Sequence, residues 1–343
     1  MGVGNSAPYM GYQSAIGIAK ETTLGTAVTA TCWLEFLSES MKFEREEIKV
    51  PAINSTRDYT KRLRGNDTVS GSVEFYLNVA EDACINIMKQ AFGGTATNAT
   101  LVSTGAYGHT LRCGDMENNK GTSTASDMKG LSMMIRKGST DTWFYTGCRV
   151  DTLTIKGEIG QPVVVTADIV GVGMSITATI GALTLATQNP CMFSGVRVYT
   201  GVSMGSASTE EFFTSFEFSI KNNISGDCRA LGSRSVVQLP PAMREVSIKL
   251  GTRYDTLTSY NRFLDATAVA IKIDMDSGVS IGATNTFTYK ATLNIPKCYY
   301  NSVNTEVGGP DMLTFEVEAT ALYGSSAGAS VVMSITNGTA NYT

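Results

Sequence analysis

The chain repeats one arrangement of strands about halfway along its length. An alternating apolar stretch around Phe43 matches another around Phe216, and Val73 matches Val246. Both pairs are 173 positions apart, since 216 − 43 and 246 − 73 give the same number. In each copy a long polar loop separates the two strands. A repeat of this size constrains the fold more than any single element does, because each copy has to form a similar unit.

A helix is expected after the second strand of each copy, over 78–92 and 252–266. Both stretches begin with a pattern that resembles a capping box, in which side chains satisfy the free backbone N–H groups of a helix start. The residues concerned are Asn78 with Glu81, and Thr252 with Asp255. Each unit then closes with a two-stranded hairpin, at 148–171 and 298–324.

These elements predict a mainly β fold, with β-sandwich or barrel units that each carry one packed helix. Thirty-four glycines and alternating strands support this fold class. The expected division is an N-terminal arm (1–30), a first domain (31–175) with a surface insertion at about 95–140, a linker (176–209), a second domain (210–325) and a C-terminal tail (326–343).

The composition argues against catalysis. His109 is the only histidine in the chain, and we expect it to lie on the surface or in a loop. One histidine cannot supply a zinc site or a two-histidine iron site. The seven cysteines contain no C-x-x-C pair, and their odd number cannot form a complete set of disulfides, so buried thiols in a reducing cytoplasm are expected. The sequence predicts no enzyme, no cofactor and no metal.

The polar positions of the strands carry more acid than the chain as a whole. Ten acids and four bases give 4 − 10 = −6, against −4 for the whole chain. The bases are Lys42, Lys156, Lys221 and Lys249, and the acids are Glu44, Glu46, Glu74, Glu158, Asp168, Glu217, Glu245, Glu306, Glu316 and Glu318. Two interpretations remain open: an ordinary solvated face, or an acidic lining that repels a polyanion and lets it slide.

The long loop of the first copy, 49–67, is basic and carries apolar residues between its charges. Its candidate contact residues are Arg57, Tyr59, Lys61, Arg62 and Arg64, and those of the second loop (222–241) are Arg229 and Arg234. Basic and aromatic residues together could contact nucleic acid. A loop of this length is more often an interaction arm, so docking on a neighbouring subunit is the favoured interpretation.

No membrane span is expected. The least charged segment, 163–186, contains only Asp168 as a charge, but its apolar residues alternate as they do in a strand. A spanning helix needs about 20 predominantly apolar residues. The first residues lack the basic and apolar regions of a secretion signal.

Three stretches resemble tail tube proteins of long-tailed bacteriophages: "IGIAKETTLGTAVTAT" (16–31), "GCRVDTLTIKGEIGQPVVVTADIVG" (147–171) and "FSIKNNISGDCRALGS" (218–233). The resemblance implies a subunit whose rings stack into a hollow tube. It implies that strands join edge to edge into one continuous β-barrel on oligomerisation, and that DNA travels through the lumen during ejection. The family has no active site.

The resemblance also implies partners and location. The resemblance implies that tube proteins with one such unit form sixfold rings. A chain with two tandem units is therefore expected to form a homotrimeric, pseudo-hexameric ring, with a homohexamer as the alternative. Other tail proteins are expected partners, DNA contacts the lumen only transiently, and assembly in the bacterial host cytoplasm leads to the virion tail. The competing hypothesis is a virion decoration or host-attachment protein built from β-sandwiches, which would carry aromatic loops at an exposed tip.

Overall fold

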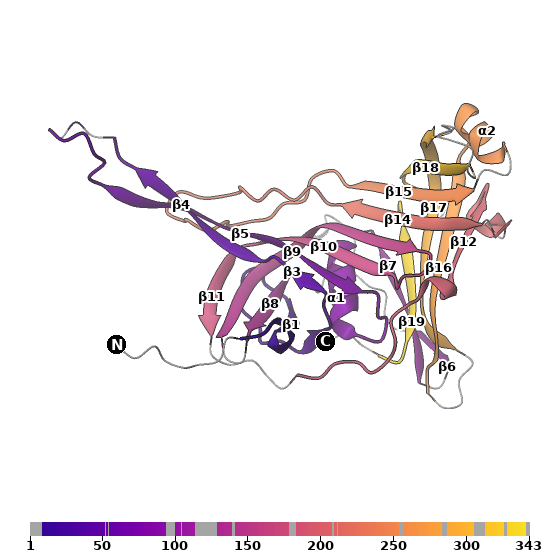
Figure 1. Ribbon diagram of the computed structural model, residues 1–343, viewed down its shortest axis with the longest axis horizontal. Helices are drawn as coiled ribbons and strands as arrows, with labels where there is room; N and C mark the ends of the chain where they lie inside the picture. Colours follow the sequence, from indigo (N-terminus) through magenta and orange to yellow (C-terminus); the bar gives the residue numbers. More distant parts are fainter. Residues whose placement is uncertain are drawn as a thin grey trace.

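A computed structural model provides the fold and describes residues 9–51, 53, 55–93, 100–103, 105–113, 129–138, 141–177, 183–207, 209–210, 212–253, 257–282, 287–304, 313–325 and 328–340. These residues form antiparallel β-structure with two α-helices (Figure 1). The prediction of a mainly β fold is therefore confirmed. Neither helix has the length and hydropathy that crossing a membrane would require.

The first part of the chain contributes the elements up to β11. They are β1 (Ala15–Glu21), β2 (Cys32–Leu34), β3 (Ser38–Glu39), β4 (Lys42–Lys49), β5 (Arg62–Tyr76), α1 (Asp82–Ala91), β6 (Thr100–Ser103), β7 (Ala106–Arg112), β8 (Gly130–Lys137), β9 (Asp141–Glu158), β10 (Val164–Gly171) and β11 (Gly173–Thr177).

The second part contributes the rest. Its elements are β12 (Val196–Gly201), β13 (Thr209–Glu210), β14 (Phe213–Lys221), β15 (Glu245–Arg253), α2 (Thr258–Leu264), β16 (Val269–Ser280), β17 (Thr288–Asn304), β18 (Thr314–Ala321) and β19 (Val332–Asn337).

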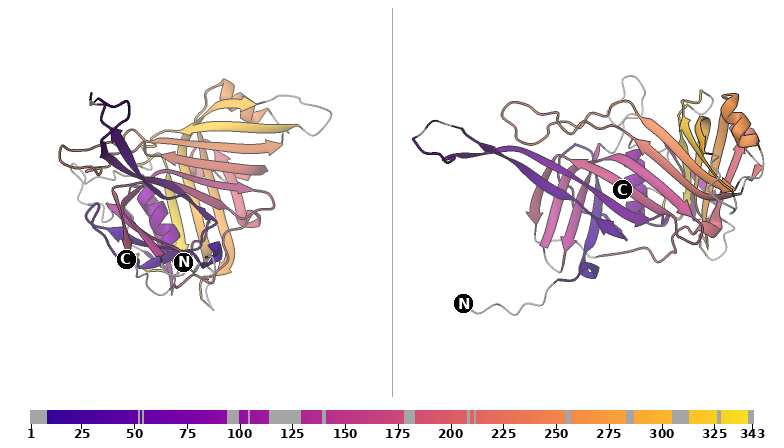
Figure 2. Two further views of the ribbon diagram at one scale, coloured as in Figure 1. Left: turned by 60° about the vertical axis from the view of Figure 1, so that its left-hand side comes forward. Right: turned by 45° about the horizontal axis from the view of Figure 1, so that its top comes forward.

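One antiparallel sheet runs through both parts in the order β4–β5–β10–β9–β14–β15–β18–β17, and we call it the central sheet. The two longest strands also leave it. The first half of β9 pairs with β8 and β11, and the first half of β17 pairs with β16 and β19. Each long strand therefore belongs to two layers, which enclose a core between them (Figure 2).

The order of strand pairing in the first part recurs in the second. The series β4–β5–β10–β9–β8–β1–β2 has the same antiparallel connections as β14–β15–β18–β17–β16–β12–β13. In addition, β11 pairs with β9 as β19 pairs with β17. The two parts thus share a topology across the described elements.

The single offset of 173 is wrong for the hairpins. Phe43 lies opposite Val69, 26 residues on, whereas Phe216 lies opposite Leu250, 34 residues on. A different match keeps the register: "SMK" (40–42) with "SIK" (219–221), and "SVEF" (72–75) with "SIKL" (247–250). Serine faces serine in both hairpins, because the Oγ atoms of Ser40 and Ser72 are 2.9 Å apart and Ser219 pairs with Ser247.

Both helices start later than the sequence predicts. The first begins at Asp82, and Asn78 instead accepts a hydrogen bond from the Ala80 N–H, 3.1 Å away. The second begins at Thr258, and Thr252 lies in β15, where its hydroxyl donates to the Phe212 carbonyl at 2.7 Å. The expected capping boxes are therefore wrong for Asn78 and Thr252, and Asp255 lies outside the described residues.

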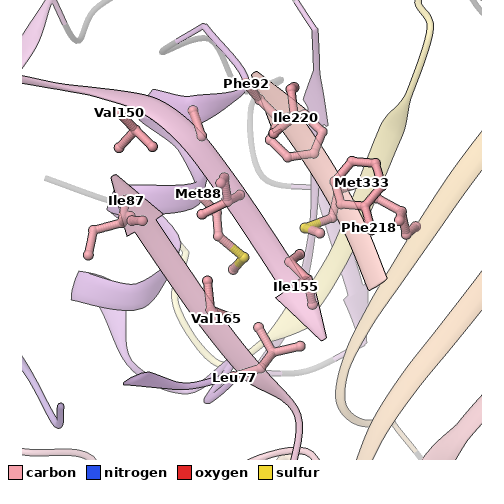
Figure 3. Close-up of a cluster of buried hydrophobic side chains, with 14 of the residues drawn as sticks. Leu77, Ile87, Met88, Phe92, Val150, Ile155, Val165, Phe218, Ile220 and Met333 are labelled. Atoms are coloured by element: carbon pink, nitrogen blue, oxygen red, sulfur yellow. The ribbon is translucent and has the colours of Figure 1, made fainter. Parts of the chain in front are cut away.

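The core is shared by the two parts. Nearly every side chain of α1 is buried, and the helix contacts β1, β2, β8 and β9. Figure 3 shows side chains from both parts packed together: Leu77, Ile87, Met88, Phe92, Val150, Ile155, Val165, Phe218, Ile220 and Met333. Burying such side chains contributes about 1.5–3 kcal/mol each, so β14 and β19 help to hold the first helix in place.

The expected surface insertion at 95–140 instead contains structural strands. In its described portion, β8 lies between β1 and β9 with Leu131 and Ile135 fully buried. Strand β7 crosses to the second part and pairs with β19, with His109 opposite Ile335. His109 is only 3% exposed, so its expected surface position is wrong. Its Nε2 atom lies 2.8 Å from the Thr339 carbonyl oxygen.

A buried carboxyl group before α1 makes stability depend on pH. Glu81 is 3% exposed, and its Oε1 atom has no hydrogen-bond partner. Burial raises the pKa of Glu81 from 4.5 to about 8. The folded protein therefore keeps this proton up to about pH 8, whereas the unfolded chain loses it near pH 4.5. Stability consequently falls as the pH rises through this interval.

We expect Glu81→Gln to remove this loss. The amide stays neutral, so the variant should be more stable than the wild type at pH 8 by a few kcal/mol and equally stable near pH 4.5. Thermal unfolding between pH 5 and 8 measures the effect, with Glu316→Gln as control, because Glu316 is exposed and does not influence the pKa of Glu81. Parallel pH profiles for wild type and Glu81→Gln would contradict the assignment.

Candidate functional site

The central sheet has one buried face and one polar face, and the polar face is ordered in rows across the strands. One row crosses β9, β14, β15 and β18 through Lys156, Glu217, Lys249 and Glu318, each residue directly opposite the next. Charge alternates along this row, and Lys249 Nζ lies 3.7 Å from Glu318 Oε1. Opposite charges on facing strands attract, so this row is close to neutral as a whole.

The neighbouring row carries hydroxyl groups. It runs from Glu74 on β5 through Thr166, Thr154, Ser219, Ser247 and Thr320. Short hydroxyl side chains can donate and accept hydrogen bonds without adding charge. The middle of the polar face is therefore hydrophilic but nearly uncharged.

Acid is concentrated toward the two ends of the strands. Glu158 and Glu316 share the row beyond Lys156, with only Ser215 and Gly251 between them. At the other end lies Asp168, whose pKa is raised by burial and by the nearby Asp151. The polar face is therefore locally negative at both ends of the strands, where no lysine lies opposite these carboxylates.

Seven of the candidate lumen residues lie on this polar face: Glu74, Glu158, Asp168, Glu217, Glu245, Glu316 and Glu318. Glu44 and Glu46 instead lie on the outer part of β4, which pairs with β5 alone. Glu306 lies outside the described residues. With Lys42, Lys156, Lys221 and Lys249 on the same face, the described balance is 4 − 7 = −3. The face is more mixed in charge than the sequence count indicated.

A two-stranded ribbon extends from the body where β4 and β5 pair alone, and we call residues 44–67 the arm (Figures 1 and 2). Its outer part exposes Ile53, Tyr59 and Leu63. Lys49 Nζ stands 5.9 Å from the centre of the Tyr59 ring, and Arg62 Nε lies 3.1 Å from Glu47 Oε1. Large exposed apolar side chains on an extended ribbon are typical of an interaction surface.

The five candidate contact residues of the first loop all lie in the arm and are exposed: Arg57, Tyr59, Lys61, Arg62 and Arg64. None of them touches the polar face of the sheet. The sequence groups these residues because they lie close together along the chain, and their role as contacts stays a prediction.

The second loop, 222–241, extends from the same end of the molecule as the arm and contacts its base (Figure 2). The Asp67 N–H donates to the Arg234 carbonyl at 3.1 Å, and Arg229 donates to the Asp67 carbonyl at 2.8 Å. Arg45 donates two hydrogen bonds to the Asp67 carboxylate, which lowers the pKa of Asp67. The side chain of Arg229 is mostly buried by these contacts, whereas Arg234 is exposed.

An apolar surface that sequence reasoning missed lies at the opposite end of the same strands. Phe212 is 84% exposed and Ile159 is 56% exposed. With Phe193 they line a hollow of about 210 Å³, bordered by Glu158, and we call it the end hollow. Two sequence features could have indicated this surface: the isoleucine in the hairpin turn "EIGQ" (158–161), and the two consecutive phenylalanines at 212–213.

The described residues offer no cluster of side chains suited to holding a metal ion. Within the residues described, no three His, Cys, Asp or Glu side chains come together to hold a metal ion. Burial lowers the pKa of His109 and raises the pKa of the Cys148 thiol, so the imidazole is held neutral and the thiol protonated near neutral pH. The structure instead presents four surfaces that could contact other molecules: the ordered polar face, the arm, the second loop and the end hollow.

A comparison with protein families agrees with these surfaces. Residues 11–321 match the family model described as phage tail tube protein. The chain belongs to the phage tail tube protein family. As a phage tail tube protein it is a structural subunit of the virion tail that assembles with itself and with other tail proteins. No curated protein matches the chain.

Family membership favours the tube subunit over a decoration or attachment protein. The match covers both parts of the fold, including β14, β15 and the second loop. For a phage tail tube protein the relevant geometry is therefore which strand edges and which ends of the sheet meet other copies.

Proposed function

We propose that three copies of this phage tail tube protein close into a ring, that rings stack into a tube, and that DNA passes through the lumen during ejection. We further propose that the chain contains two copies of one tube domain, at 31–175 and 210–325. The recurring order of strand pairing supports the second point. The junction between β9 and β14, which joins the two parts inside one chain, is the observation that carries the proposal.

That junction follows a simple pattern. Strand β8 pairs with β9 only as far as Cys148, and β14 takes its place along the same edge from Thr152 onward. In the second part β16 pairs with β17 only as far as Cys298. Beyond it, over residues 299–304, no described strand pairs with β17 on that side. The ribbon that corresponds to β14 is β3–β4, and its outer edge likewise has no strand partner among the described residues.

Ring closure pairs these two edges. Open strand edges promote uncontrolled association unless they are paired or covered, and a closed ring leaves none. The second part of one chain would therefore receive β3–β4 of the next chain, as β9 receives β14. Each chain contributes the eight strands of the central sheet, so three chains give 3 × 8 = 24 strands. A homohexamer would need twice that number.

The polar face of the central sheet would line the lumen, because its other face is occupied by the core. Hydroxyl rows and alternating charges offer DNA no basic track to grip, and the carboxylates at the strand ends repel phosphates. Such a wall suits passage without binding. The arm and the second loop would connect successive rings, and assembly would take place in the bacterial host cytoplasm.

A cysteine pair tests both closure and stoichiometry. Ser219 lies opposite Thr154 at the internal junction, and the corresponding pair between chains is Ser40 with Ser302. Facing side chains in adjacent strands have Cβ atoms about 4.5–5.5 Å apart, which a disulfide can bridge with little movement. The Ser40→Cys/Ser302→Cys variant should therefore form disulfides between chains in mildly oxidised rings.

The expected result on a non-reducing gel is a ladder that ends at three chains. The two positions lie on opposite outer strands of one central sheet, so a bond within one chain is not expected. Ser40→Cys/Ser280→Cys, with its second cysteine on the outer layer, is the matched control, and the single variants account for the native cysteines. A ladder that continues to six chains would establish the hexamer, and rings without the disulfide would refute this edge pairing.

A further inference from the structure

The end hollow and the tip of the arm lie at opposite ends of the same set of strands. The arm continues from the end of β4 and the start of β5, and the second loop continues from the end of β14. The end hollow is formed where β9 ends and β14 begins, at Glu158 and Phe213. In a stack of rings that all point the same way, arms that leave one ring face the hollow-bearing end of the next.

The tip of the arm has the shape and composition of an inserting element. Ile53 is fully exposed, and Tyr59 is 66% exposed. Between 49 and 64 there are five bases (Lys49, Arg57, Lys61, Arg62 and Arg64) and one acid (Asp58), a balance of 5 − 1 = +4. The tip therefore presents apolar side chains surrounded by positive charge.

The end hollow has the complementary composition. Its lining includes Phe212, Ile159 and Phe193, all of which expose more than a third of their surface. Glu158 and Arg197 both border the hollow. Glu316, in the same row as Glu158, adds a second carboxylate beside it. Apolar surface at the centre, with two acids and one base around it, matches an arm tip with apolar residues and an excess of bases.

We propose that the arm tip of one ring docks in the end hollow of the adjacent ring, with a second copy of this chain as the only occupant. This inference rests on the proposed function, and it names the receiving surface for the arm. The contact is head to tail, since two different surfaces meet. Such contacts do not close on themselves and so generate a filament of any length.

Truncating the hollow tests the proposal. Phe212→Ser and Phe212→Ser/Ile159→Ser should leave folding and ring formation unchanged, because both side chains are exposed. Each should raise the lowest protein concentration that supports tube elongation by about tenfold or more, as for a central contact residue worth at least 1.4 kcal/mol. Ile176→Ser, which removes an equally exposed side chain from β11, is the control and should assemble normally. Electron microscopy and sedimentation separate rings from tubes.

A disulfide between rings gives an independent readout that does not depend on the serine variants folding. Tyr59→Cys/Phe212→Cys should form, in oxidised tubes, covalent species larger than one ring, and should form none in isolated rings. Tubes without such species, together with normal elongation of Phe212→Ser, would overturn the docking. If the wild-type protein forms neither rings nor tubes, the proposed function itself fails, and the two failures are thereby distinguished.

Discussion

Gly157→Ala is expected to destabilise the fold and to prevent ring formation. Gly157 lies directly opposite Phe216 at the junction of β9 and β14. A Cβ atom at position 157 would overlap Cε1 of Phe216, a ring that is 3% exposed. The ring must turn toward the end hollow, which it also lines, or the two strands must separate. Overpacking of this kind costs about 1–3 kcal/mol and sometimes more.

The measurement is urea unfolding of Gly157→Ala beside Gly205→Ala, where an added Cβ meets no atom within 4 Å. The cost at position 157 should largely disappear in a Phe216→Ala background, because the clash is then absent and the two substitutions are coupled. Equal costs with and without the Phe216 ring would show that the contact does not govern the junction. Size-exclusion chromatography of the same variants reports ring formation.

Shortening the arm is expected to leave the subunit folded but to prevent rings from stacking. Lys49 and Arg62 face each other across the ribbon, so a two-residue Asn-Gly turn can join them in place of residues 50–61. The removed residues contribute little to the core, so thermal stability should stay close to that of the wild type. Tube formation should stop at single rings, because the apolar and basic contacts between rings are gone.

The control replaces residues 50–61 with a Gly/Ser linker of equal length. It keeps the chain length but lacks the side chains, and it should fail to stack in the same way. Electron microscopy of both variants beside the wild type decides the matter. Tubes of normal length from either variant would show that the arm does not connect rings.

The sequence was sufficient for the fold class and for the family. Alternation of apolar and polar residues is a local property, so the polar face and seven of its acids could be located from it. The arm could be recognised because its charged and apolar residues are contiguous. Predicting these features does not require knowing which strands are neighbours in the sheet.

Strand register could not be obtained in the same way. The 173-residue offset aligned Phe43 with Phe216, but pairing with Val69 and Leu250 places them at different positions in their hairpins. Register depends on turn geometry and on burial across the sheet, and neither is visible in one strand. The alternating charges of Lys156, Glu217 and Lys249 became apparent only once the strands were placed side by side.

Long-range contacts account for the remaining differences. Arg229 belonged to a set of exposed bases by its sequence, yet its hydrogen bond to the Asp67 carbonyl joins residues 162 positions apart. The end hollow combines a turn after β9 with the segment before β14 and with Phe193. Each contributes one or two apolar residues, too few to stand out within its own segment.

The pairing of β7 with β19 also sets an order of events during synthesis. Arg112 and Val332 are partners although 220 residues separate them. At about 5–20 residues per second, the ribosome leaves β7 without this neighbour for roughly 10–45 s. Until β19 emerges, the first part of the chain carries an unpaired strand edge that nothing made so far can cover. The outer layer of the second part is consequently among the last structures to form, and slow or interrupted translation would prolong the interval in which nascent chains can associate wrongly.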